Sequence, residues 1–173
     1  KWGYTNTLTY GGESNVSGTV TVKEGERYTL EVPDIADEYD FLGWFTEDGV
    51  QLTDEEGESL SAWDTKFGNI TVYPRTELAL TYVYHEKTDS YEVSGSDRTR
   101  EMSAIEIPAY YRDGKPVTAV YDFSGHENLV DVSIPATVTE IGETTFAESP
   151  LLEEYTIYAV NGANDPAYKS EGG

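Results

Sequence analysis

The chain has no cysteine and few basic residues. Without cysteine, its 173 residues can form no disulfide, thiol nucleophile or zinc–thiolate site. Lysine and arginine number 11 against 33 acidic residues, which gives a formal net charge of -22 at pH 7. Because so negative a surface repels phosphate backbones and anionic lipid headgroups, we expect no nucleic-acid partner. No apolar run approaches the roughly 18 residues that cross a bilayer, so we also expect no membrane insertion of this chain.

An initiating methionine and a signal peptide are also missing, since the chain opens Lys1-Trp2-Gly3. We interpret the chain as an excised piece of a longer protein. The missing leader therefore carries no information about the compartment in which the protein works.

The sequence is instead rich in β-type alternation. It contains 14 Tyr and 3 Trp, which is too aromatic for a disordered acidic chain. Alternating runs rich in Thr, Val, Ile and Tyr occur at residues 19–22, 28–32, 70–73 and 78–84. We therefore predict a mostly-β fold, in which only residues 53–66 are expected to form a short helix.

The pattern changes at residues 74–77. Pro74 should stop a strand, and the polar residues after it bury nothing, so we expect a hinge there. The predicted domains are residues 1–77 and 78–173. The first carries 16 acidic and 5 basic residues and the second 17 and 6, so each half has a formal charge of -11.

The second half contains an internal repeat with a period of 23 to 27 residues. The motif L-x-x-I-x-I begins at Met102 and recurs from Leu129 and Leu152. Each turn of such a repeat buries its apolar edge only against the next turn, which predicts a stacked solenoid. The residues expected to face its core are Ile107, Val120, Phe123, Ile134, Ile141 and Phe146.

Residues 134–142 (IPATVTEIG), followed by Phe146, resemble the BspA-like leucine-rich repeat of bacterial surface proteins. Residues 110–118 (YYRDGKPVT) are similar to the longer first repeat of that family, and residues 80–93 fit its opening hairpin. The resemblance covers residues 78–173 and implies a short leucine-rich-repeat solenoid. Residues 164–172 resemble an insertion within these repeats, so we expect the solenoid to be truncated at its C-terminal end.

Residues 41–45 (FLGWF), the Gly49 turn and residues 70–73 (ITVY) resemble the Listeria–Bacteroides repeat, also called the internalin B-repeat. The resemblance implies a small β-grasp-like α+β module. The sequence departs from that pattern where Pro74-Arg75-Thr76 replaces the usual A-x-W.

No catalytic or cofactor-binding motif is present. His85 and His126 lie outside recognisable metal or nucleophile motifs, so we expect structural roles for both. Glycine-rich phosphate loops are also absent from the sequence. We therefore expect no enzymatic activity, no catalytic residue and no cofactor.

One acidic cluster is a candidate metal site. Its carboxylates are the hard oxygen ligands that calcium prefers, although they lack EF-hand spacing. A solvated acidic face is the alternative interpretation. The cluster consists of Asp54, Glu55, Glu56 and Glu58.

Aromatic side chains are the other candidates for ligand contact. Trp44 and Phe45 are candidates for a sugar-stacking platform, but a module this small needs Trp44 and Phe41 in its core. Tyr110 and Tyr111 raise the same question, and the BspA-like resemblance favours a structural role for them.

Together the resemblances imply a non-catalytic fragment of an extracellular bacterial protein, on the cell surface or secreted. The implied role is adhesion, with a protein or glycan on a host or neighbouring cell as the partner. A structural spacer stalk and a carbohydrate-binding module are the alternatives, and the sequence does not name the ligand.

Overall fold

The computed structural model describes residues 3–152 and 156–158, and the chain divides into two compact units, Lys1–Glu77 and Leu78–Gly173. In this described part the fold is built from β-strands and contains no α-helix. The mostly-β prediction is therefore confirmed. No helix in these residues is long and apolar enough to cross a membrane.

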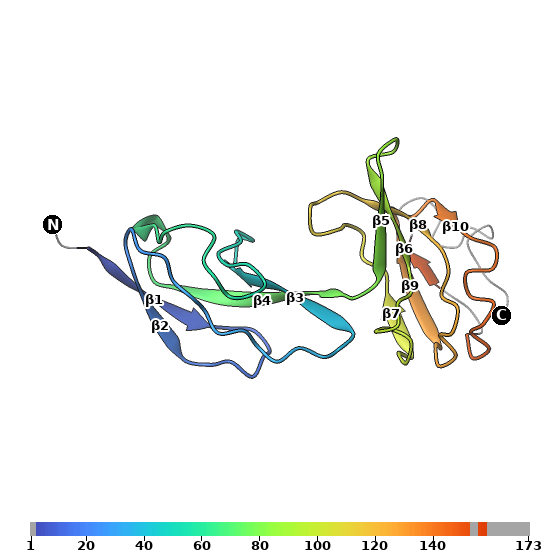
Figure 1. Ribbon diagram of the computed structural model, residues 1–173, viewed down its shortest axis with the longest axis horizontal. Helices are drawn as coiled ribbons and strands as arrows, with labels where there is room; N and C mark the ends of the chain where they lie inside the picture. The colour runs from blue at the N-terminus through green and yellow to red at the C-terminus, as the bar shows by residue number, and fades with distance from the viewer. Residues whose placement is uncertain (1–2, 153–155, 159–173) are drawn as a thin grey trace. The chain divides into compact units, whose positions relative to one another are not determined.

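The first unit is organised around a four-stranded sheet in the order β2-β1-β4-β3 (Figure 1). Its strands are β1 (Thr5–Tyr10), β2 (Thr19–Lys23), β3 (Tyr39–Phe45) and β4 (Ile70–Leu78). β1 and β2 form an antiparallel hairpin, whereas β1 and β4 run parallel with Leu8 beside Ile70. Alternation along these strands places Leu8, Val22 and Val72 in one buried cluster.

Pro74 lies within β4, so the expectation that it would end the strand is wrong. The pairing of β1 with β4 ends at Tyr10 and Val72, two residues earlier. The missing N–H of Pro74 therefore removes no hydrogen bond from that ladder.

Trp44 is the centre of the first core and has no exposed surface. Its ring lies 4.8 Å from Tyr10 and 6.0 Å from Phe41, and its Nε1 donates to the carbonyl of Glu31 at 2.9 Å. Gly43 precedes it with a φ of 132°, and a Cβ at this position would lie 2.2 Å from the Thr53 carbonyl oxygen. Only glycine fits where β3 approaches this backbone so closely.

The predicted helix at residues 53–66 is wrong. Gly57 has a φ of 81°, and a Cβ there would lie 2.1 Å from the Leu30 carbonyl oxygen, so this segment packs in an irregular conformation. The Asp54 side chain accepts hydrogen bonds from the backbone N–H groups of Glu56 and Glu58, which competes with a helix. A single 3-10 turn, η1 (Thr65–Phe67), follows instead.

The second unit contains two sheets (Figure 1). One has the order β10-β8-β6-β5 and the other the order β11-β9-β7. β5 and β6 form an antiparallel hairpin, and the other neighbouring strands of the two sheets pair in parallel. The strands are β5 (Thr81–His85), β6 (Ser90–Ser94), β7 (Ala104–Glu106), β8 (Val117–Val120), β9 (Asp131–Pro135), β10 (Glu140–Ile141) and β11 (Thr156–Tyr158).

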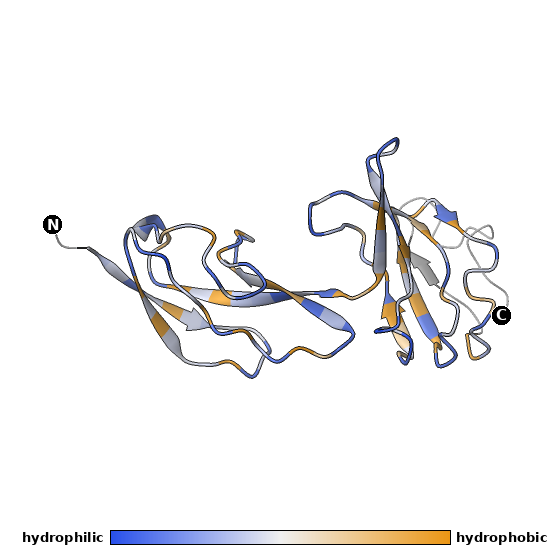
Figure 2. Cartoon of the chain, in the orientation of Figure 1, coloured by the Kyte–Doolittle hydropathy of each residue, from blue (hydrophilic) through white to orange (hydrophobic). Residues whose placement is uncertain are grey.

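Residues that the repeat makes equivalent are strand partners. Ile105 pairs with Val132, and Ile134 pairs with Ile157, so β7, β9 and β11 are in register. In the other sheet, Val120 pairs with Ile141. Polar and apolar residues alternate along β9, where Val132 and Ile134 are buried (Figure 2). Tyr155 and residues 159–173, to which the sequence assigns a third repeat and an insertion, lie outside the described residues.

The prediction that six residues face the core of the second unit is confirmed. Ile107, Val120, Phe123, Ile134 and Phe146 are buried in one cluster, and Ile141 of β10 is partly buried and packs against it.

Candidate functional site

The acidic cluster is spread along a turn. The Asp54 carboxylate accepts from the N–H groups of Glu56 at 2.9 Å and Glu58 at 3.0 Å, and the Glu58 carboxylate accepts from the Thr29 hydroxyl. Glu55 is exposed. Across residues 3–152 and 156–158, no group of three or more His, Asp or Glu side chains is arranged to hold a metal ion.

Trp44 and Phe45 are both buried, so neither presents a platform to solvent. The guanidinium carbon of Arg75 lies 4.4 Å from the centre of the Phe45 ring. Burial of Trp44 removes the main argument for sugar stacking at the FLGWF motif.

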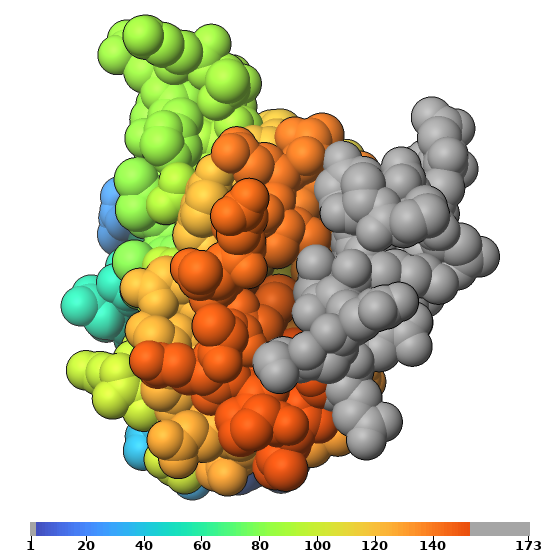
Figure 3. All heavy atoms as spheres, turned by 90° about the vertical axis from the view of Figure 1, so that its right-hand side faces the viewer, coloured from blue at the N-terminus to red at the C-terminus, as the bar shows by residue number. Residues whose placement is uncertain are grey.

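The most prominent exposed aromatic surface lies on the hairpin β5–β6, which projects beyond the packed turns of the second unit (Figures 1 and 3). Tyr82 and Tyr84 are two residues apart on β5 and share one face, and Tyr91 on β6 is the strand partner of Tyr84. Tyr111 joins them from the loop before β8. We call Tyr82, Tyr84, Tyr91 and Tyr111 the tyrosine cluster.

The four rings are in continuous contact. Ring centroids are 5.3 Å apart for Tyr84 and Tyr91, 4.4 Å for Tyr91 and Tyr111, and 4.7 Å for Tyr82 and Tyr111. All three pairs are tilted, an arrangement within the range that aromatic rings prefer. Tyr84 is 44% exposed, so the cluster is open to solvent at this ring. Tyr110, which precedes Tyr111 in the sequence and is not part of the cluster, is 58% exposed.

Charged side chains hold the cluster in place. Lys115 lies 5.0 Å above the Tyr84 ring and pairs with Asp89, which also accepts a hydrogen bond from the Tyr84 hydroxyl. The hydrogen bond from Lys115 keeps the pKa of Asp89 below its usual value. On the other side, the Tyr91 hydroxyl donates to Asp113 at 2.7 Å, and this bond raises the pKa of Tyr91 to about 12.

This arrangement suits contact with another protein. Tyrosine and arginine are enriched at protein interfaces, where they combine a large apolar area with a polar end. Cations cover parts of the cluster already, since Lys115 lies over Tyr84 and Arg112 lies 5.1 Å from the Tyr111 ring centre.

Of these residues, only Tyr110 and Tyr111 are candidates for ligand contact on the sequence alone. Tyr111 packs within the cluster, in line with a structural role, whereas Tyr110 is largely exposed. Tyr82, Tyr84 and Tyr91 were missed. In the sequence, the cluster could have been inferred from the tyrosines that lie on both sides of the polar hairpin turn at residues 86–89.

Both histidines contact other protein atoms through their ring nitrogens. His85 is exposed, with its Nε2 3.1 Å from a Glu92 carboxylate oxygen. His126 is buried, with Nε2 2.9 Å from the Thr99 hydroxyl and Nδ1 3.2 Å from the Ser124 carbonyl oxygen.

The described fold and surface define a two-unit, mostly-β protein with an exposed tyrosine-rich hairpin. Comparisons of the chain with protein families, with curated proteins and with solved structures give no match.

Proposed function

We propose that the chain is a non-catalytic adhesion fragment of an extracellular bacterial protein, on the cell surface or secreted. Residues 78–173 form a BspA-like leucine-rich-repeat solenoid in this proposal. The in-register pairing of Ile105 with Val132, and of Ile134 with Ile157, supports it, because a solenoid requires equivalent residues to stack.

Residues 1–77 form a β-grasp-like module of the internalin B-repeat type in the same proposal. The strand order β2-β1-β4-β3, with parallel β1 and β4 at its centre, supports this assignment. The helical part of the α+β description finds no support, because the described residues between β3 and β4 contain only η1.

The observation that carries the adhesive role is the tyrosine cluster. It is a pre-ordered aromatic surface, and ordering it in advance lowers the entropy cost of binding. The charged side chains beside the cluster are paired, since Lys115 forms an ion pair with Asp89. The chain as a whole has a formal charge of -22. We therefore propose a protein on a host or neighbouring cell as the partner.

Binding of the fluorescently labelled chain to an array of matrix proteins and glycans tests this role. The proposal expects saturable binding to at least one protein. A spacer stalk would bind nothing on the array, and binding confined to glycans would contradict a protein partner.

A further inference from the structure

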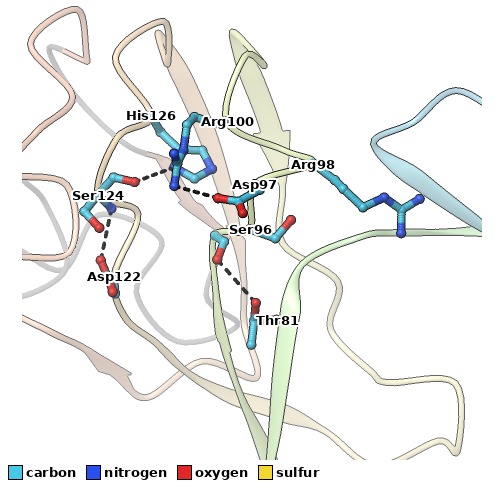
Figure 4. Close-up of a pocket in the computed structure, with 9 residues that line it drawn as sticks. Thr81, Ser96, Asp97, Arg98, Arg100, Asp122, Ser124 and His126 are labelled. Carbon is cyan, nitrogen blue, oxygen red and sulfur yellow. Dashed lines mark hydrogen bonds and ion pairs between the residues drawn. The ribbon is translucent and has the colours of Figure 1, made fainter.

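A polar cleft of about 530 Å³ lies within the second unit, where the hairpin β5–β6 ends and the first turn of the repeat begins. Residue 81 and the segments 95–100 and 122–126 line it. Figure 4 shows the side chains of Asp97 and Arg100 paired on one side of the cleft and those of Asp122 and Ser124 together on another, with Arg98 directed away from them. The Thr81 hydroxyl donates to the Gly95 carbonyl oxygen at 3.4 Å. Ligand pockets commonly have volumes of roughly 300–1,000 Å³, so the cleft is large enough for a small ligand.

Packing holds one wall of the cleft rigid. The His126 ring lies 5.1 Å from Phe123, and both of its nitrogens are within hydrogen-bond distance of protein atoms. A Cβ at Gly95 would lie 2.2 Å from His126 Cε1, so the end of the hairpin can lie this close to the ring only because residue 95 is glycine. The wall is therefore fixed before any ligand arrives.

The cleft presents donors and acceptors side by side. Arg100 pairs with Asp97 at 2.8 Å, yet its side chain is 49% exposed and retains guanidinium N–H groups for a ligand. Asp122 accepts from the Ser124 N–H at 3.1 Å, and hydrogen bonds from Ser124 keep the pKa of Asp122 below its usual value. The cleft thus places the carboxylates of Asp97 and Asp122 beside a guanidinium and hydroxyl groups.

We propose that this cleft binds one or two units of a neutral saccharide. Each sugar hydroxyl both donates and accepts, which matches the donors and acceptors that Arg100, Asp97, Asp122 and Ser124 contribute to the lining. An apolar ligand would leave these polar groups unsatisfied, at a cost in affinity. An anionic ligand is disfavoured, because the cleft contains two carboxylates and residues 78–173 have a formal charge of -11. A metal ion is disfavoured by the positive charge of the Arg100 guanidinium.

This site is separate from the tyrosine cluster, so the saccharide site and the protein-binding role of the cluster can be refuted independently.

The probes are the methyl glycosides of glucose, galactose, mannose and N-acetylglucosamine, titrated into the ¹⁵N-labelled chain. We expect one of them to shift the amide resonances of Gly95, Ser124 and Gly125 with a dissociation constant on the order of 1 mM, as for other small polar ligands.

Two variants probe the cleft itself. Arg100→Ala should weaken binding about tenfold or more, because it removes charge-assisted hydrogen bonds from an exposed position. Ser124→Tyr should abolish binding by filling the space. Arg112→Ala is the matched control, because it removes an arginine that lies outside the cleft, and it should leave the affinity unchanged.

Three outcomes would overturn the proposal. One is the absence of amide shifts with all four glycosides at concentrations well above the expected constant. Another is sugar binding that survives both Arg100→Ala and Ser124→Tyr. The third is shifts of the same amides by calcium chloride alone, which would identify a cation site.

Discussion

Replacing Gly43 with alanine should strongly destabilise the first unit while leaving the second intact. The new Cβ would lie 2.2 Å from the Thr53 carbonyl oxygen, so the backbone of Thr53 must retreat by about 1 Å to reach an ordinary contact. That movement breaks the hydrogen bond from the Trp44 N–H to the buried Thr53 hydroxyl, which is 3.0 Å long. The loss costs about 1–3 kcal/mol, and the positive φ of residue 43 adds about 1–3 kcal/mol.

The total of about 4 kcal/mol is comparable with the whole stability of a unit of this size, about 4–12 kcal/mol at ~0.05–0.15 kcal/mol per residue. Gly18→Ala is the matched control. Gly18 also has a positive φ, of 100°, but a Cβ there meets no atom within 4 Å. It should therefore lose only the backbone contribution.

Tryptophan fluorescence makes the measurement specific, because all three tryptophans precede residue 78. Guanidinium unfolding followed by this signal should show a much lower midpoint for Gly43→Ala than for Gly18→Ala. Equal midpoints would refute the close approach of β3 to Thr53.

Three further predictions concern the second unit. Phe123→Ala should lower the free energy of unfolding of the second unit by about 3–5 kcal/mol, as measured by circular dichroism. The unfolding transition of the first unit, followed by tryptophan fluorescence, should not move. A loss below about 1 kcal/mol would contradict the burial of Phe123. Gly95→Ala should destabilise the unit by about 1–3 kcal/mol and shift the His126 ring resonances, since its Cβ would overlap that ring; unchanged resonances would refute the contact. Tyr91 should ionise near pH 12, and Asp113→Ala should return its pKa towards about 10, as followed by NMR. Because the folded pKa is raised, the stability from this bond is complete below pH 10 and is lost as the pH rises through 12; the same pKa in both proteins would contradict the Tyr91–Asp113 bond.

The register of the repeat was predictable because it depends on the alternation and spacing of apolar residues along the sequence. Alternation identifies each strand, and the 27-residue spacing identifies Ile105 with Val132, which the structure pairs. Burial of Trp44 followed from the need of a small module for a large core residue. Ile141 packs against the core as predicted but is only partly buried, and position in the repeat does not reveal the extent of burial.

What the sequence did not reveal depends on contacts between distant segments. Residues 53–66 are locally compatible with a short helix, but Gly57 packs against the Leu30 carbonyl, 27 residues earlier. In the same way, Tyr111 joins Tyr82 only because the loop before β8 folds back on the hairpin. Neither contact has a local signature.

The most direct test of the adhesive role compares the wild-type chain with a Tyr84→Ser/Tyr110→Ser double variant against a protein partner from the array. Tyr84 is 44% exposed and Tyr110 is 58% exposed, so the variant should fold, and Tyr4→Ser is the control because Tyr4 is exposed in the first unit. Since interface tyrosines commonly contribute more than about 1 kcal/mol each, we expect the dissociation constant to rise about 10-fold to 100-fold in the double variant and to stay unchanged in the control. An affinity equal to wild type in the double variant would contradict an adhesive surface formed by Tyr84 of the cluster and the neighbouring Tyr110.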